Sequence, residues 1–283
     1  MKKLNFYFAF AILGIFTGII SCSEKNVEPK DLKAEFEKSA ELHTEVMERI
    51  YSALTAEQSL SKDKLLNITE TVTLKFISDN NSAFQNMGEA ADICESERKR
   101  LEVYKMAASN QFKLDGEVDF LYATIKEYES HLTEGQIELL LKVHNTLLSS
   151  NDPEIIVTNL REIKDIDCLA LPPEERNYIY AATTIGIESI IYWSENLDDW
   201  YYVVSSNDAD LMAKNAQLKG WFNWKDVGNE DISGAIGGAV GGAIVGSVAG
   251  GVGAVPGAAA GCVAGGIGSS ATSAVRQLID HYF

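Results

Sequence analysis

Apolar side chains recur every three or four positions along residues 31–203, with charged side chains between them. This spacing is typical of helices that bury one face. The pattern begins at Asp31 and indicates further helices over 64–77, 89–110 and 114–132. The apolar positions of the first segment are Leu32, Phe36, Ala40, His43, Met47, Ile50 and Leu54.

Capping residues mark where later helices should begin. Thr133 is followed three residues later by Gln136, the pattern of a capping box, and the helix it opens should end near residue 148. Asp152 followed by proline is a second start signal, because proline fits the first turn of a helix. A last long helix is expected over 173–203. Six or seven helices with short connections predict an all-α fold, an irregular helical bundle.

The C-terminal part of the chain has a different pattern. The 44 residues from Ile232 to Val275 carry no charge and contain 14 of the 22 glycines. Residues four apart share one face of a helix, so glycines at that spacing form a flat stripe. Two such stripes occur, the first at Gly234, Gly238, Gly242, Gly246 and Gly250, and the second at Gly253, Gly257, Gly261 and Gly265.

These stripes predict a glycine-zipper helical hairpin with arms near 232–250 and 256–278. At 1.5 Å per residue each arm is roughly 30 Å long, which matches the hydrocarbon core of a bilayer. Glycine stripes also let helix backbones pack closely in lipid. The alternatives are a hairpin packed inside its own domain and a flexible low-complexity linker. We therefore expect a helical domain at 31–230 followed by a hairpin domain at 231–283.

The N-terminus carries an export signal. Two lysines precede an apolar stretch over residues 4–20, which has the charge and length of a secretory signal peptide. The stretch ends in Ile19-Ile20-Ser21-Cys22, which resembles the lipobox of bacterial lipoproteins. The resemblance implies a signal peptide over 1–21, cleavage after Ser21, acylation of Cys22 and a short tether over 22–30. An ordinary signal peptide with a chance cysteine, or an uncleaved anchor, are the alternatives.

The same resemblance implies a place in the cell envelope. In many such lipoproteins an aspartate after the cysteine signals retention in the inner membrane, and this chain has Ser23 there. We therefore expect a lipid-anchored protein with the outer membrane favoured over the inner one. The bilayer is the first expected partner, because two or more acyl chains hold a protein stably on a membrane.

Charge narrows the choice of other partners. The formal net charge is −17, and loss of the signal peptide with its two lysines makes it −19, all of it between Cys22 and Asp231. So acidic a surface argues against nucleic acid as a partner, because phosphate binding needs a basic face.

The glycine-rich tail resembles two kinds of bacterial sequence. One is the glycine-zipper region of envelope lipoproteins, and the other is the class II bacteriocin peptides, whose GxxxG helices act at target membranes. The first resemblance implies a structural or interaction role, with a hairpin that associates with membranes and could form homo-oligomers. The second implies the alternative, an antagonistic, membrane-perturbing protein in which the hairpin is the effector.

Aromatic and cysteine side chains add two further expectations. Trp221, Phe222 and Trp224 lie just before the glycine run, so they could form an interfacial aromatic belt. Cys94 and Cys168 could form a disulfide in an oxidising compartment, although the sequence leaves open whether they are close.

Support for catalysis is weak. None of the four histidines has the spacing of a metalloprotease, zinc-finger or di-iron site, and no nucleophile elbow or phosphate-binding loop occurs. Glu127 and His131 are four apart and could seat a metal, but such pairs are more often surface pairs. We expect no enzyme activity, cofactor or metal site.

Overall fold

The computed structural model describes residues 33–79, 119–205 and 222–248. It also describes scattered positions near the C-terminus, all helical, which we call the tail segment: 258, 261–262, 265–266, 269, 273–275 and 277–279. The chain divides into two compact units, Met1–Lys30 and Asp31–Phe283, and every described residue belongs to the second. The expected signal peptide and tether, and the helix expected over 89–110, lie outside the described residues.

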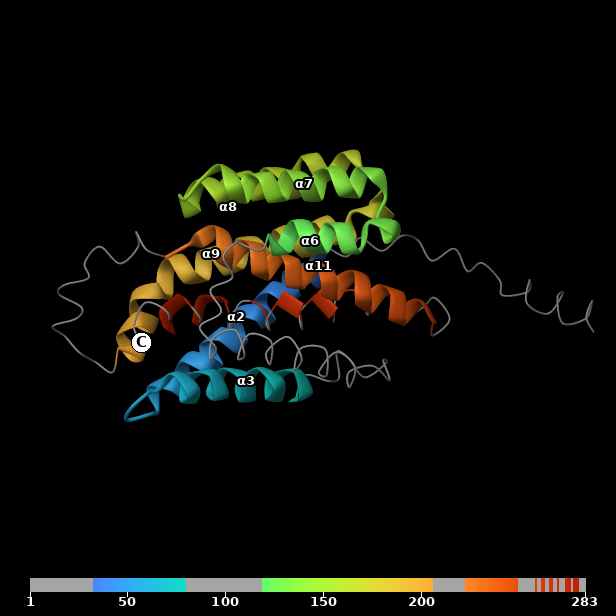
Figure 1. Ribbon diagram of the computed structural model, residues 1–283. Coiled ribbons are helices and arrows are strands. Elements are labelled where there is room, and N and C mark those ends of the chain that lie inside the picture. Colours follow the sequence, from blue (N-terminus) through green and yellow to red (C-terminus); the bar gives the residue numbers. More distant parts are fainter. Residues whose placement is uncertain are drawn as a thin grey trace, which may run out of the picture. The chain divides into compact units, whose positions relative to one another are not determined.

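Helices make up the described part of the chain, and no strand occurs in it (Figure 1). The all-α prediction is confirmed. Short 3-10 helices lie at Glu129–His131, Asp167–Ala170 and Pro173–Glu175. The α-helices are α2 (Lys33–Thr55), α3 (Lys62–Asp79), α6 (Phe120–Glu127), α7 (Glu134–Ser149), α8 (Pro153–Asp165), α9 (Asn177–Val204) and α11 (Trp224–Val248).

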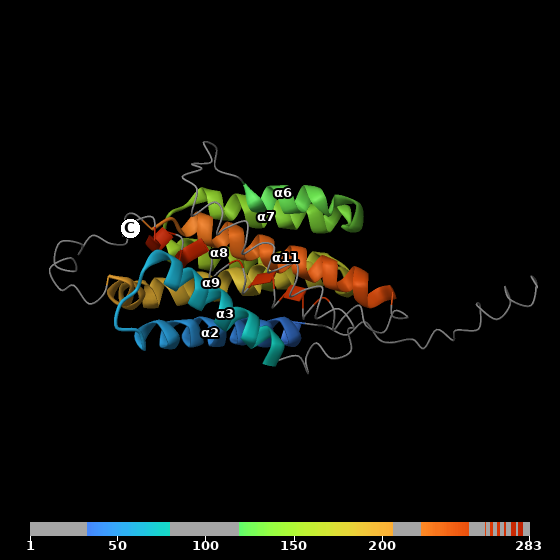
Figure 2. The same cartoon turned by 60° about the horizontal axis from the view of Figure 1, so that its bottom comes forward.

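Helix α9 occupies the centre of the described fold. It packs against α2 on one side, α7 and α8 on another, and α11 along its length. Helix α3 covers α2, and α6 lies on α11 and α7 (Figures 1 and 2). Most of α9 is buried as a result, which is why its sequence is apolar on nearly every face.

Two helix starts follow the capping signals in the sequence. The backbone N–H of Gln136 donates to Thr133 Oγ1 at 3.3 Å, and Thr133 N donates to Gln136 Oε1 at 2.9 Å, which completes the capping box of α7. Asp152 Oδ1 accepts a hydrogen bond from Glu154 N at 2.9 Å at the start of α8. These two predictions are confirmed.

Other boundaries differ from the sequence prediction. The helix expected to run to residue 132 ends at Glu127, and the chain turns at Tyr128 into a 3-10 helix. Glu127 and His131 therefore do not share a helix, and both side chains are exposed. Helix α11 starts at Trp224, eight residues before the expected start, so it crosses the expected domain boundary at residue 230 without a break.

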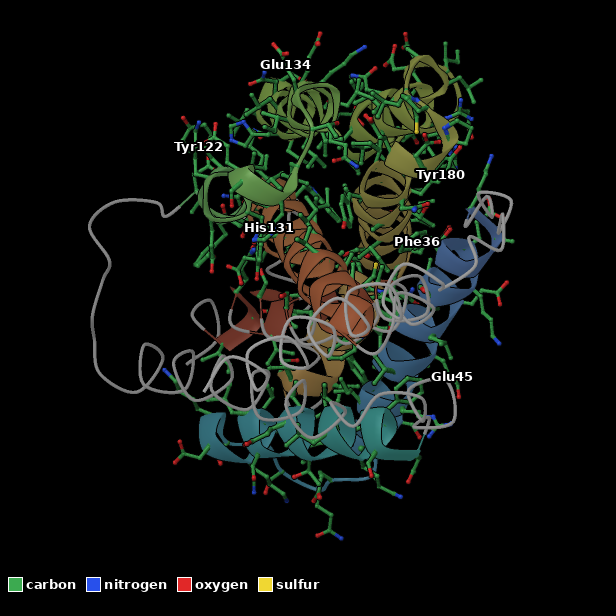
Figure 3. The ribbon with its side chains drawn as sticks, turned by 90° about the vertical axis from the view of Figure 1, so that its right-hand side faces the viewer. Phe36, Glu45, Tyr122, His131, Glu134 and Tyr180 are labelled. Atoms are coloured by element: carbon green, nitrogen blue, oxygen red, sulfur yellow. The ribbon has the colours of Figure 1, made fainter. Side chains whose placement is uncertain are left out.

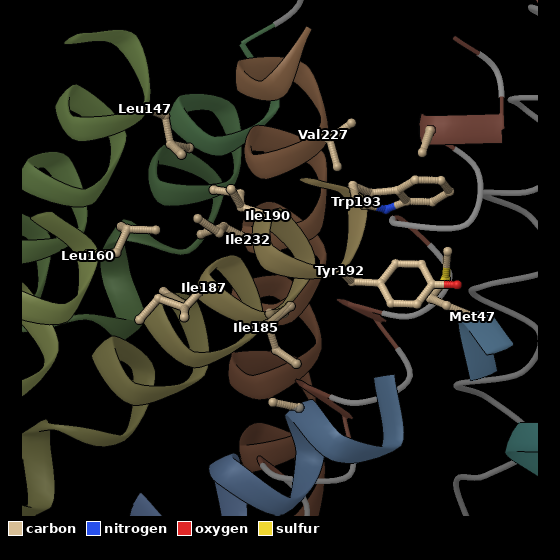
Figure 4. Close-up of a cluster of buried hydrophobic side chains, with 14 of the residues drawn as sticks. Met47, Leu147, Leu160, Ile185, Ile187, Ile190, Tyr192, Trp193, Val227 and Ile232 are labelled. Carbon is tan, nitrogen blue, oxygen red and sulfur yellow. The ribbon is translucent and has the colours of Figure 1, made fainter. Parts of the chain in front are cut away.

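Side chains separate into an acidic exterior and one apolar interior. Glu45 and Glu134 point outward while Phe36 points inward (Figure 3). The interior is continuous from α2 through α9 to α11 and the tail segment. Gly186 makes one contact in it possible, because a β-carbon there would lie 2.5 Å from the side chain of Ile232. Ile232 fills this space beside Ile190, facing Leu160 (Figure 4).

Candidate functional site

Four glycines form a close backbone crossing between α11 and the tail segment, which we call the glycine crossing. A β-carbon on Gly238 would lie 1.9 Å from the carbonyl oxygen of Gly261, and one on Gly234 would lie 2.2 Å from that of Gly265. The reverse distances, from Gly261 and Gly265, are 1.9 and 2.1 Å. Real β-carbons do not approach other atoms so closely, so only glycine fits at these four positions.

The crossing has an antiparallel register. Residue numbers rise along α11 from Gly234 to Gly238 while they fall along the tail segment from Gly265 to Gly261. The same register extends to the start of α11, where Asn223 N donates to Gln277 Oε1 at 2.8 Å and Gln277 Nε2 donates to Asn223 O at 3.2 Å. Two helical segments therefore pack side by side with glycine on glycine.

The remaining predicted glycines are placed only in part. Gly242 is buried in α11, and Gly246 lies near the end of that helix. Gly250, Gly253 and Gly257 lie outside the described residues, and so does the turn expected between the two arms. The hairpin as a whole accordingly stays a prediction.

Aromatic side chains before the glycine run are buried. Phe222 and Trp224 are each 4% exposed and contact each other with ring centroids 4.8 Å apart. Phe222 also lies 6.1 Å from Trp193, which in turn lies 4.8 Å from Trp200. In this conformation the two residues belong to the core of the helical domain, which differs from the expected interfacial belt. Trp221 lies outside the described residues.

Helix α11 carries two buried carboxylates just before its glycines. Glu230 is 1% exposed and Asp231 is fully buried. Ser189 Oγ of α9 donates a hydrogen bond to Asp231 Oδ2. Burying a carboxylate is costly unless hydrogen bonds compensate, so this contact fixes α11 against α9 at one register. This contact was not predicted from the sequence, where polar residues directly before an uncharged run were the one visible signal.

A second polar network joins α6, α7 and α11. Asp119, the N-cap of α6, accepts from Tyr122 N at 3.0 Å and from Asn229 Nδ2 at 3.2 Å, and its other carboxylate oxygen is bonded to His144 Nε2. Asn229 Oδ1 accepts from Leu121 N at 2.6 Å. Although burial of Asp119 acts in the opposite direction, the hydrogen bonds from Tyr122, His144 and Asn229 lower the pKa of its carboxyl group. The network attaches the glycine-bearing helix to its neighbours.

Replacing Asp119 by alanine should destabilise the fold by about 1 kcal/mol at neutral pH, the usual cost of losing a helix N-cap. Asp119→Asn keeps the cap and should cost less. Because the carboxyl pKa is lowered, its contribution to stability is present above the unfolded-state pKa and is lost as the pH falls through the folded-state pKa. Urea unfolding at pH 7 and at about pH 3 measures both effects. An equal loss at both values would contradict the assignment.

The possible disulfide between Cys94 and Cys168 is not tested by the described contacts. Cys168 is fully buried in the 3-10 helix after α8, and Cys94 lies outside the described residues. Cys262 is a free, fully buried thiol beside Gly261, and burial raises the pKa of that thiol well above its usual value.

The glycine crossing, as the described residues show it, is a packing contact. No helix among them is long and apolar enough to cross a bilayer. Within the same residues, no group of three or more histidine, cysteine, aspartate or glutamate side chains could hold a metal ion. Comparison with protein-family models, curated proteins and solved structures gives no match. What the site can do is hold two helical segments together at minimal distance.

Proposed function

We propose that this chain is a lipid-anchored protein of the bacterial cell envelope with a structural or interaction role. The lipobox resemblance at Ile19-Ile20-Ser21-Cys22 supports the anchor. The glycine crossing, in which two glycines of each stripe pack against each other within one chain, supports the structural role. Because these glycines already contact each other within one chain, they support a self-packing element of a folded domain. Cys22 would attach that domain to the outer membrane through acyl chains.

The glycine crossing also bears on how the hairpin could meet a membrane or a second copy. Gly234, Gly238, Gly261 and Gly265 are occupied within one chain. A homo-oligomer built on these same glycines would have to exchange hairpins between copies, as in domain swapping. We propose that membrane association begins with the lipid at Cys22 and that the hairpin adds to it where the domain rests on the bilayer.

Labelling the full-length precursor with an alkyne fatty acid in a Gram-negative host tests the anchor. Wild-type protein should incorporate the label and pellet with outer membranes. Cys22→Ala should lose the label, and any of this protein that has lost residues 1–21 should leave the membrane fraction. The matched control is Ser23→Asp, which should keep the label but move the protein to the inner membrane.

Two results would change the proposal. Absence of label at Cys22 would remove the lipid anchor altogether. If Cys22→Ala protein that has lost residues 1–21 still pellets with membranes, the tail is a second anchor in its own right.

The alternative function, a membrane-perturbing effector, needs α11 and the tail segment to leave the interior in which they are packed. Adding the full mature chain to dye-loaded vesicles at neutral pH tests it. We expect no leakage beyond that of an unrelated acylated protein. Dye release that Gly242→Leu abolishes would favour the effector function over the structural one.

A further inference from the structure

A small cavity lies where two parallel helices end. It has a volume of about 150 Å³ and is lined from the last turns of α2 and α9 and from the loop between α2 and α3. Leu54, Leu60 and Val203 supply apolar surface, while Tyr51, Tyr202 and Glu57 bring aromatic rings and a carboxylate. The cavity is partly open to solvent, and a space of this volume is large enough for a molecule the size of benzene.

The last turns of two helices line this cavity. Helices α2 and α9 run in the same direction (Figures 1 and 2). Lys33 at the start of α2 is close enough to Tyr180 near the start of α9 for the two groups to interact electrostatically. Tyr51 near the end of α2 packs on Trp200 near the end of α9. The last-turn carbonyl groups of a helix carry a partial negative charge that favours cations. Neither helix has a basic residue in its last turn, and neutral donors oppose the charge there: Glu57 N donates to Leu54 O at 3.2 Å, and Ser205 Oγ donates to Tyr202 O at 3.0 Å.

Carboxylates strengthen the negative field on the same side. Burial, together with the charges of Asp199 and Glu48, raises the pKa of the Tyr51 hydroxyl. Glu57 lies in the cavity wall and pairs with Lys64 at 2.5 Å. Lys64 Nζ also donates to Ser59 O at 3.3 Å, so this ammonium group lies at the cavity edge and opposes the field there.

Two tyrosine rings also line the cavity. Tyr202 is 39% exposed and Tyr51 is half-buried, so both rings stand at the boundary between the cavity and solvent. Tyrosine faces attract organic cations, and quaternary ammonium groups are recognised by combinations of aromatic rings. From the cavity, the helix ends, the carboxylates and the rings, we propose that this site binds a small organic ammonium ion.

Choline is the probe for this proposal, and its neutral isostere 3,3-dimethyl-1-butanol is the matched control ligand. Binding to the full mature chain in a non-ionic detergent is measured by titration calorimetry. Tryptophan fluorescence is a second readout, because the ring centroid of Trp200 lies 5.7 Å from that of Tyr51. Choline should bind at one site with an affinity of about millimolar. The neutral isostere should bind at least about 5-fold more weakly.

Substitutions distinguish a cation-binding site from a merely apolar cavity. Tyr202→Leu should weaken choline binding about 5-fold, while Tyr122→Leu, which removes an exposed tyrosine on α6, should leave it unchanged. Glu57→Gln should weaken it, whereas Glu129→Gln, which removes a carboxylate paired to Lys126 on the surface, should not. Lys64→Met should tighten choline binding, because it removes the opposing charge.

Three outcomes would overturn the proposal. Equal binding of choline and the neutral isostere would show a merely apolar cavity. If the Tyr202→Leu variant, checked for folding by circular dichroism, binds choline as tightly as wild type, the tyrosine rings do not take part in binding. Phosphocholine binding as tightly as choline would contradict the negative field, since its phosphate should be repelled there.

Discussion

Gly238→Ala should destabilise the fold by at least about 3 kcal/mol, the upper part of the range for inserting atoms into a packed interior. The added β-carbon would lie 1.9 Å from the carbonyl oxygen of Gly261 and 2.5 Å from its carbonyl carbon. Both are backbone atoms of a helical residue, so relief requires α11 and the tail segment to move apart. Urea unfolding followed by circular dichroism measures the loss.

The adjacent Gly237 provides the matched control. A β-carbon there would meet only Tyr128 at 3.7 Å and Thr124 at 3.8 Å, which are ordinary van der Waals contacts. Alanine is the better helix former by about 1 kcal/mol, so Gly237→Ala should be neutral or stabilising. A close crossing requires that the same substitution change the free energy of unfolding in opposite directions at these two neighbouring positions. Similar small effects at both positions would mean that the two segments are not in contact in solution.

Sequence periodicity predicted the helices well because their signals are local. The capping box at Thr133 and the proline start after Asp152 depend on residues within one turn, and both are found in the structure. The four-residue glycine spacing likewise identified a flat helix face. What that face packs against depends on residues far away in the chain, so the pairing of Gly238 with Gly261 could only be expected in outline.

Burial was harder to predict than secondary structure. The sequence predicted that Phe222 and Trp224 form an interfacial aromatic belt because they precede an uncharged run, whereas in the structure Phe222 packs against Trp193 of α9 and both residues are buried. The start of α11 was missed for a related reason. The uncharged run suggested an arm starting near residue 232, whereas the helix begins at Trp224 and includes the buried Glu230 and Asp231, the latter bonded to Ser189. Such contacts form only once distant helices have assembled.

Acid should destabilise the protein through His43 before its carboxylates are protonated. His43 on α2 is fully buried, and neither ring nitrogen has a hydrogen-bond partner among the described residues. Burial lowers the pKa of this imidazole from 6.5 to about 4. Between these values the unfolded chain binds a proton that the folded chain does not, so stability falls as the pH falls. The loss should reach roughly 3 kcal/mol by pH 4.

Replacing His43 with leucine, which has a similar volume and no titratable group, should remove this fall while leaving stability at pH 7 equal or higher. Leaving two unpartnered nitrogens buried is costly, so their removal does not weaken the neutral form. His131→Leu is the control, because His131 is exposed and its replacement should leave the acid dependence of wild type in place. Urea unfolding across pH 4 to 7 gives the comparison. If wild type and His43→Leu lose stability in parallel, His43 is not buried in the neutral form, and α2 does not pack against α9 as described.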